Sequence, residues 1–204
     1  MPDFKMGNPA QTVLSQSGTA RPTWGAGVPK GSVIEQFMSP CDGSTITVQS
    51  GTYTVQNVTA KQVLTTTFAA VTGSTIDYTP PTGTQTVIYT FSFQSAWPDD
   101  HSIASYKLFL DNDSGALTEV TNARFGDGGM FLEHIQTFIW AFHIGGSDND
   151  VTGRRDTWTS ARTIQLQANE LGSANERYLH STNYFDTGGT DTFHQPVIGI
   201  TALA

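Results

Sequence analysis

The stretch from Thr65 to Phe93 constrains the fold of this 204-residue chain more than any other part of it. From residue 87 onward, apolar side chains occupy every second position, namely Val87, Tyr89, Phe91 and Phe93. Alternation with a period of two is typical of a strand with one buried face. The preceding segment, Tyr78–Gly83, contains two prolines and a glycine, which interrupt a strand and favour a turn. The stretch therefore predicts strand, turn and strand.

The composition is that of a folded protein with few charges. Hydrophobic residues make up 37% of the chain, which is too many for a disordered protein, whereas only 14% of the residues are charged. A net charge of −8 disfavours a phosphate-binding surface, so we expect no nucleic-acid partner. The sequence has no run of about 18 apolar residues, so we expect no membrane insertion.

The N-terminal part of the chain differs from the rest. Proline and glycine are frequent up to residue 30, and the only apolar run there is Val13-Leu14, so this part cannot bury enough surface to fold alone. A short helix is expected next, because Ser32 and Glu35 fit a capping box and the apolar residues between Val33 and Met38 would share one face. We therefore predict an extended attachment arm with a short helix over residues 1–40, and a second region over 41–204.

Residues 41–204 read as all-β. Short runs of alternating apolar and polar residues are separated by turns rich in Gly, Asn, Asp and Ser, for example at Ser50-Gly51 and Asp111–Gly115. About nine or ten short strands of this kind fit a β-sandwich, most simply a jelly roll, with an immunoglobulin-like sandwich as the second choice. We find no repeat of fixed period, which counts against a propeller or solenoid.

One predicted strand, Phe138–Ile144, is apolar on both faces except for His143. A strand of an antiparallel sheet normally exposes one face to solvent. Because this strand is apolar on both faces, each face is expected to pack against other residues. The second cover is either a loop of the same chain or another subunit. We favour a subunit, which makes Phe138, Trp140 and Phe142 the predicted subunit interface.

Two segments resemble virion proteins. Gln11–Trp24 follows the form V-L-x-x-S-G-x-x-x-P-x-W, which is similar to a short element of phage tail-fibre and other virion appendage proteins. The resemblance implies that Leu14 and Trp24 anchor the arm onto another virion protein. The alternative is a disordered linker with one incidental tryptophan.

The second segment, residues 64–94, resembles a pattern of virion proteins from tailed phages and marine viruses. The positions that keep the character of the pattern are Val71, Thr72, Gly73, Ile76, Thr79, Pro80, Val87 and Tyr89. Ala70 stands where an acidic residue is common, and Thr86 stands where lysine is frequent, so the pattern is shared but the residues differ. The resemblance implies a homotrimeric β-sandwich carried on a virus particle as a fibre head, head decoration or tail component.

The loop after the Thr65–Phe93 stretch holds the candidate ligand site. Trp97 could stack on the apolar face of a sugar or receptor group while Asp99, Asp100 and His101 form hydrogen bonds. The alternative is that Trp97 closes one end of the core. A glycan hydrolase would need two carboxylates across a cleft, and Asp99, Asp100 and Glu133 are candidates by residue type only.

Other chemistry has little support, and we expect neither enzymatic activity nor a cofactor or metal. No P-loop, GxGxxG or G-x-S-x-G motif occurs, and the histidines lack metal-ligand spacing. The acidic loops at Asp111–Gly115 and Ser147–Asp150 invite a calcium interpretation but fail the EF-hand pattern. Cys41 is alone and is expected to be a buried or idle thiol. The sequence thus favours a virion structural protein, with a lectin-like receptor-binding module as the alternative.

Overall fold

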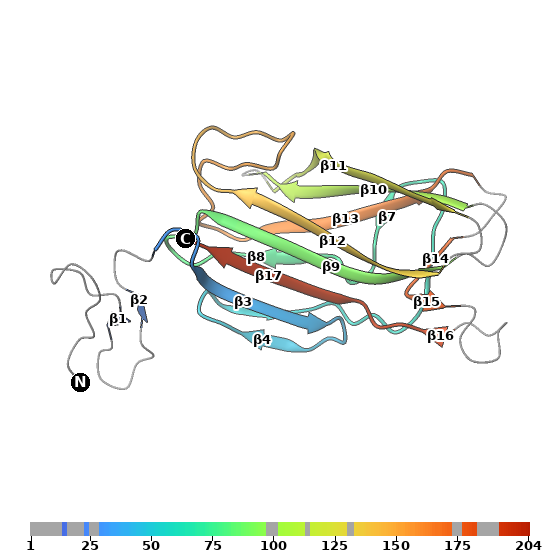
Figure 1. The fold of residues 1–204 in the computed structure, drawn as a ribbon, viewed down its shortest axis with the longest axis horizontal. Coiled ribbons are helices and arrows are strands. Elements are labelled where there is room, and N and C mark those ends of the chain that lie inside the picture. The colour runs from blue at the N-terminus through green and yellow to red at the C-terminus, as the bar shows by residue number, and fades with distance from the viewer. Residues whose placement is uncertain are drawn as a thin grey trace.

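The structure, a computed structural model, describes residues 29–96, 102–112, 115–129, 133–172, 177–182 and 192–204, together with two short strands at 14–15 and 23–24. Every regular element among these residues is a β-strand, and no helix occurs in them. The strands form two curled antiparallel sheets that pack face to face (Figure 1). The predicted all-β, jelly-roll-like sandwich is confirmed.

The first sheet has six strands. Its order is β3 (Val33–Pro40), β17 (Val197–Leu203), β9 (Thr86–Ala96), β14 (Tyr178–Leu179) and β6 (Gln62–Val63). Strands β17 and β14 pair with successive parts of one edge of β9. The sixth strand, β12 (His134–His143), pairs with the opposite edge of β9 along ten residues, from His134 opposite Ser95 to His143 opposite Thr86. The long strand β9 is therefore central, and β12 is an edge strand.

The second sheet has five strands. Its order is β11 (Leu117–Gly129), β10 (Ser102–Asp111), β13 (Arg162–Glu170) and β7 (Ala69–Ala70), with β8 (Ile76–Tyr78) also paired to β13. Its edge strand β11 lies on the same side of the sandwich as β12 (Figure 1). Two-stranded pairs complete the described elements: β4 (Thr45–Thr47) with β5 (Thr52–Thr54), β15 (Ser181–Thr182) with β16 (Thr192–Phe193), and β1 (Leu14–Ser15) with β2 (Thr23–Trp24).

The core lies between the two sheets. The alternation predicted for β9 is confirmed, because Val87, Tyr89, Phe91 and Phe93 are fully buried. They meet the inward side chains of β10 and β13, among them Leu108 and Leu166. Burial of each large apolar side chain stabilises a fold by roughly 1.5–3 kcal/mol, so this alternating row fixes which face of β9 turns inward.

The predicted helix at residues 32–38 is wrong. Val33–Pro40 is the strand β3, which pairs with β17 from Pro40 opposite Val197 onward. The Glu35 carboxylate does not cap a helix; it is buried and accepts hydrogen bonds from the Ser50 backbone N–H (2.8 Å) and the Tyr78 hydroxyl (2.9 Å). Because β3 belongs to the first sheet, the sandwich includes residues that we assigned to the arm.

The side chains of β12 predicted as the subunit interface lie on the core side of the strand in their own chain. Phe142 is fully buried and Phe138 is 9% exposed, both inside the core of their own chain, and Trp140 is half-buried beside them. The two-sided apolar character of the strand is real, however. The opposite face of β12 carries Ile135 and Ile139, which are 58% and 59% exposed.

Candidate functional site

A large bulge shapes the edge strand β11. Tyr106 of β10 lies opposite Phe125, and Leu108 lies opposite Val120, so residues 121–124 of β11 lie opposite Lys107 alone. Bulges of this kind bend a strand and re-aim its side chains, often beside functional sites. Here the bulge turns part of β11 toward the edge strand of the other sheet.

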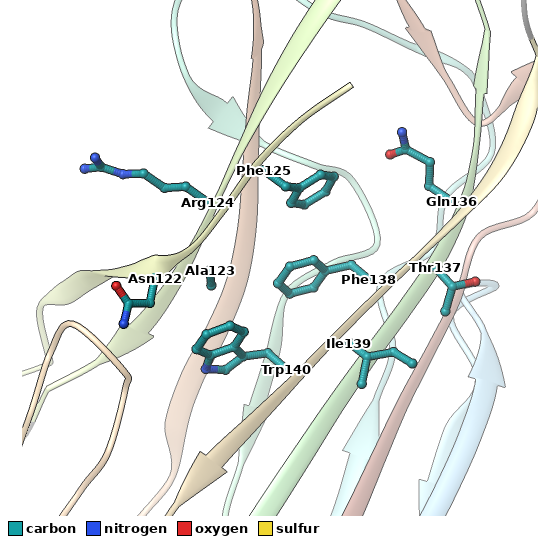
Figure 2. A pocket seen from close by; sticks show the side chains of 9 residues that line it. All are labelled: Asn122, Ala123, Arg124, Phe125, Gln136, Thr137, Phe138, Ile139 and Trp140. Carbon is teal, nitrogen blue, oxygen red and sulfur yellow. The ribbon is translucent and has the colours of Figure 1, made fainter. Parts of the chain in front are cut away.

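A groove of about 460 Å³ lies between the edges of β11 and β12. Its walls include Asn122, Ala123 and Phe125 from β11, and Gln136, Phe138 and Trp140 from β12. Figure 2 shows the rings of Phe125, Phe138 and Trp140 turned into the groove, whereas Thr137 and Ile139 point to the other side of β12. The groove thus opens where the two sheets are not joined by hydrogen bonds.

Aromatic rings form the floor of this groove. Phe125 stacks on Phe138 across the gap between the sheets, with ring centroids 5.3 Å apart. On the other side Phe125 stacks on Tyr106 at 4.4 Å, and Phe138 contacts Tyr89 at 6.2 Å. The floor is therefore the surface of the core and is held rigid by it.

The loop at residues 145–156 is hydrogen-bonded to two residues that line the groove. The Asn122 backbone N–H donates to the carbonyl of Val151 (3.0 Å), and Trp140 Nε1 donates to the carbonyl of Thr152 (3.1 Å). The loop packs closely against the core at Gly153, where a Cβ would lie only 2.7 Å from Cδ1 of Phe142. The loop thereby contacts both β11 and β12.

An ionic cluster around Asp127 contacts Gln136, another residue that lines the groove. Arg177 is fully buried, forms an ion pair with Asp127 of β11, and donates from Nε to Ser95 Oγ of β9 (2.8 Å). Burial lowers the pKa of the Arg177 guanidinium, and the nearby Tyr106 and Asp127 oppose this shift. Asp127 also accepts a hydrogen bond from Gln136 and lies 3.3 Å from His134 Nε2, so the cluster ties β11 to β12.

A second feature is the outer face of the first sheet. The side chains that β12, β9, β17 and β3 turn away from the core include no Asp, Glu, Lys or Arg. One row across the face runs from Ile139 through Thr90 and Gly199 to Met38, each the register partner of the next. Met38 is 63% exposed, so the described part of the chain leaves this uncharged face open.

The outer face of the second sheet is of the ordinary charged and polar kind. Glu119 of β11 pairs with Lys107 Nζ (3.4 Å) and Arg124 Nε (2.5 Å). The hydrogen bond from Arg124 is the main cause of the lowered pKa of Glu119. Strand β13 adds Gln165 and Gln167, which are hydrogen-bonded to each other. The lack of charge is therefore particular to the first sheet.

The other predicted site residues fall in different places. Trp97, Asp99, Asp100 and His101, proposed as a ligand loop, lie outside the described residues. Leu14 and Trp24 are backbone register partners in the β1–β2 pair, and their side chains lie outside what the structure describes. Glu133 accepts a hydrogen bond from Thr182 Oγ1.

Cys41 is fully buried, as expected for an idle thiol, and Sγ donates to the carbonyl of Gly73 (3.3 Å). Burial raises the pKa of the Cys41 thiol to about 12. Within the described ranges, no three His, Cys, Asp or Glu side chains come together as metal ligands. None of the described elements is a helix able to cross a bilayer.

The groove was missed by sequence reasoning. Its walls come from strands that are not paired with each other. The sequence of β11 by itself does not indicate the bulge. The uncharged face could have been found, because the outward positions of Thr86–Gln94 are visible in the alternation and none is charged.

Of the comparisons with known proteins, only the comparison with solved structures finds similar chains. No known protein family and no curated protein match the chain. A solved chain titled "Structure of infectious bursal disease virus Gx strain" aligns with 83% of this chain at 7% sequence identity and a TM-score of 0.35. This chain spans only 36% of that one. A likeness at this TM-score carries no argument about the function of this chain.

Proposed function

We propose that this chain is a non-enzymatic structural protein of a virus particle that assembles with copies of itself. The observation that carries the proposal is the uncharged outer face of β12, β9, β17 and β3. The chain has a net charge of −8, yet this face has no charged side chain and exposes Ile135, Ile139 and Met38. Exposed apolar patches of this kind mark surfaces that another molecule covers.

The size of the face is informative. Four strands about 4.8 Å apart, each with seven to eleven residues at about 3.3 Å, give a flat area of roughly 450–700 Å². A standard stable interface takes about 800 Å² from each partner. The face therefore supplies more than half of what an assembly needs, and a further contact from the same chain has to supply the rest.

In this proposal the N-terminal arm is a link to the particle and is not part of the contact between copies. In the finer form of the proposal, three copies form a homotrimer as a fibre, head decoration or tail component. The arm anchors this trimer to another virion protein through Leu14 and Trp24. This part of the proposal rests on the sequence resemblance of residues 11–24 and 64–94.

Purified particles of the virus that encodes the chain test this proposal. We expect the protein to remain with washed particles in gels and mass spectra, and gold-labelled antibodies to mark regular positions on them. Absence of the chain from washed, infectious particles would contradict a structural role.

Substitutions in the arm test the anchoring role. A full-length chain with Leu14→Asp and Trp24→Ala should keep its oligomeric mass but be lost from particles, because only the anchor is removed. Gln11→Asp with Thr23→Ala, in the same arm, is the matched control and should be retained. If both pairs of substitutions leave incorporation unchanged, the arm is not the anchor.

A receptor-binding or lectin-like role is the second candidate. The loop first considered for it lies outside the described residues, but the aromatic floor between β11 and β12 favours the same class of function at another place.

A further inference from the structure

We propose that the two edge strands of the first sheet pair between copies of the chain, so that β12 of one copy forms an antiparallel ladder with β3 of the next. This inference rests on the proposed assembly into a homotrimer and names the further contact that the outer face requires. Four features of the described residues carry it: the lack of edge protection, the free backbone groups, the strand directions and the width of the face.

The edge strands β11 and β12 differ in protection. Proteins shield free strand edges with charged side chains, prolines, bulges or very short strands. Strand β11 has the bulge at residues 121–124 and carries Glu119 and Arg124. Strand β12 pairs with β9 along ten residues without a bulge and contains no Asp, Glu, Lys, Arg or Pro. Within the described ranges β12 pairs with β9 alone, so an unshielded edge is left open.

The edge of β12 has backbone groups that point away from its own sheet. In an antiparallel ladder, successive residues bond alternately to the strand on one side and to the strand on the other. The Ile144 N–H, which continues the ladder between β12 and β9, donates to the Gln85 carbonyl (2.8 Å). The N–H and C=O groups of Ile139 and Ala141, at the odd positions, therefore lie on the free edge.

Strand β3, at the opposite edge of the same sheet, has matching groups. The Cys41 N–H continues its ladder with β17 by donating to the Pro196 carbonyl (2.8 Å). The N–H and C=O groups of Gln36 and Met38, at the even positions, therefore lie on the free edge. Their side chains are exposed on the outer face, as are those of the free-edge residues of β12. Opposite residues of an antiparallel pair turn their side chains to one face, so the two edges match.

A three-fold axis along the strands brings these two edges together in the required direction. Antiparallel pairing of β12 with β9, of β9 with β17 and of β17 with β3 makes β3 run opposite to β12. Rotation about such an axis preserves strand direction, so β12 of one copy meets an oppositely directed β3 of the next. Contacts between two different surfaces close into a ring when the rotation closes, as it does for three copies.

The same rotation sets the register between copies, because it keeps each residue at its height along the axis. One row of register partners crosses the sheet from Ile139 to Met38, and another crosses it from Ala141 to Gln36. Ile139 is therefore level with Met38 of the neighbouring copy, and Ala141 is level with Gln36 of that copy. These four residues are the ones with free backbone groups, so direction, face and height all agree.

The width of the face fits a closed trimer. Four strands about 4.8 Å apart make each side of the ring roughly 19 Å wide, which places the middle of each side about 5.5 Å from the axis. Sheets that pack face to face lie about 10 Å apart, so each fills about 5 Å on its own side. Met38 also lies over Gly199, where a Cβ would be 3.3 Å from its Cε, so apolar surface extends from the edge toward the middle. Edge pairing thus lets the three faces fill the interior.

Cysteine cross-linking of the full-length chain tests the pairing. Gln36→Cys combined with Ala141→Cys places one thiol on each edge at the same height, and a disulfide forms only where the two Cβ atoms lie about 4 Å apart. Under mild oxidation we expect a covalent trimer in denaturing, non-reducing gels. The native Cys41 is fully buried and should not react.

Single and displaced cysteines are the controls. Each single variant should run as a monomer, because residue 36 of one copy faces residue 141 of the next and not its own equivalent. Gln36→Cys with Thr137→Cys, which is displaced along β12 by about 13 Å, should form about tenfold less trimer. Equal cross-linking by both pairs would overturn the proposal. So would a dimer from Ala141→Cys alone, because β12 would then pair with itself around a two-fold axis.

Proline at the free edge separates this proposal from the burial of the outer face. Ala141→Pro removes the N–H that donates to the neighbouring copy and leaves the bonds between β12 and β9 in place, since edge strands tolerate proline there. We expect the monomer mass by light scattering with an unchanged circular dichroism spectrum, whereas Ala141→Val should keep the trimer. A trimer in both the wild type and Ala141→Pro would rule out edge pairing and leave the assembly proposal standing. A monomeric wild type would contradict both proposals.

Discussion

At the scale of single residues, His180 is the most unusual group in the described chain. It is fully buried, its backbone has a φ of 62°, and its ring meets Phe91 and Phe93 edge-on, with centroids 6.4 and 6.2 Å away. Burial, with a smaller contribution from the nearby His194, lowers the pKa of His180 from 6.5 to about 4. The folded protein therefore holds this imidazole neutral over a pH range in which the unfolded chain protonates it.

This difference predicts a loss of stability in mild acid. Above pH 6.5 both states are neutral at His180, and as the pH falls from 6.5 toward 4 only the unfolded state takes up the proton. The free energy of unfolding should fall by about 1.4 kcal/mol per pH unit in this window, or about 3 kcal/mol in all. Urea unfolding of the wild type and of His180→Asn, which tolerates a positive φ, measures the effect. The variant should lose most of this slope between pH 6.5 and 4.5, and an equal slope in both proteins would contradict the assignment.

At the scale of elements, the loop at residues 145–156 joins the edges of the two sheets. It contains Gly145 and Gly153, both with positive φ, at 107° and 73°. A Cβ at Gly145 meets nothing within 4 Å, whereas a Cβ at Gly153 would overlap the ring of Phe142 and approach Val120. The two glycines therefore share a backbone requirement but differ in packing.

This contrast gives a matched pair of substitutions. Gly145→Ala should cost about 1–2 kcal/mol through backbone strain alone. Gly153→Ala should cost about 1–3 kcal/mol more, because the added methyl group overpacks the contact between the loop and β12. Thermal or urea unfolding of both variants measures the difference. Equal destabilisation would mean that the loop does not press on Phe142 as described.

The elements also show what the sequence could and could not predict. Strand β9 was predictable because the alternation of apolar and polar residues is visible in its own sequence. Its inward residues can be identified without knowing which strands it pairs with. The helix predicted at residues 32–38 failed because the partners of Glu35 are Ser50 and Tyr78, which are remote in sequence. The groove was not predictable because the bulge at residues 121–124 exists only in the register of β11 against β10.

At the scale of the whole molecule, the two outer faces of the sandwich differ in charge. The outer face of the second sheet carries Lys107, Glu119 and Arg124, as a solvated surface does. The outer face of the first sheet carries no charge and exposes Ile139 and Met38, which is costly in water unless another surface covers it. In the proposed assembly, this face is buried between copies of the chain.

The most direct test of this claim is the mass of the protein in solution. Light scattering at micromolar concentration should give three times the chain mass of 22.0 kDa for the wild type. Ile139→Lys should give the monomer mass, because it replaces an exposed apolar side chain of the uncharged face with a charge. The same change on the other sheet, Ile103→Lys, at a side chain 46% exposed, should leave the trimer intact. A monomeric wild type, or a trimer that survives Ile139→Lys, would contradict the account.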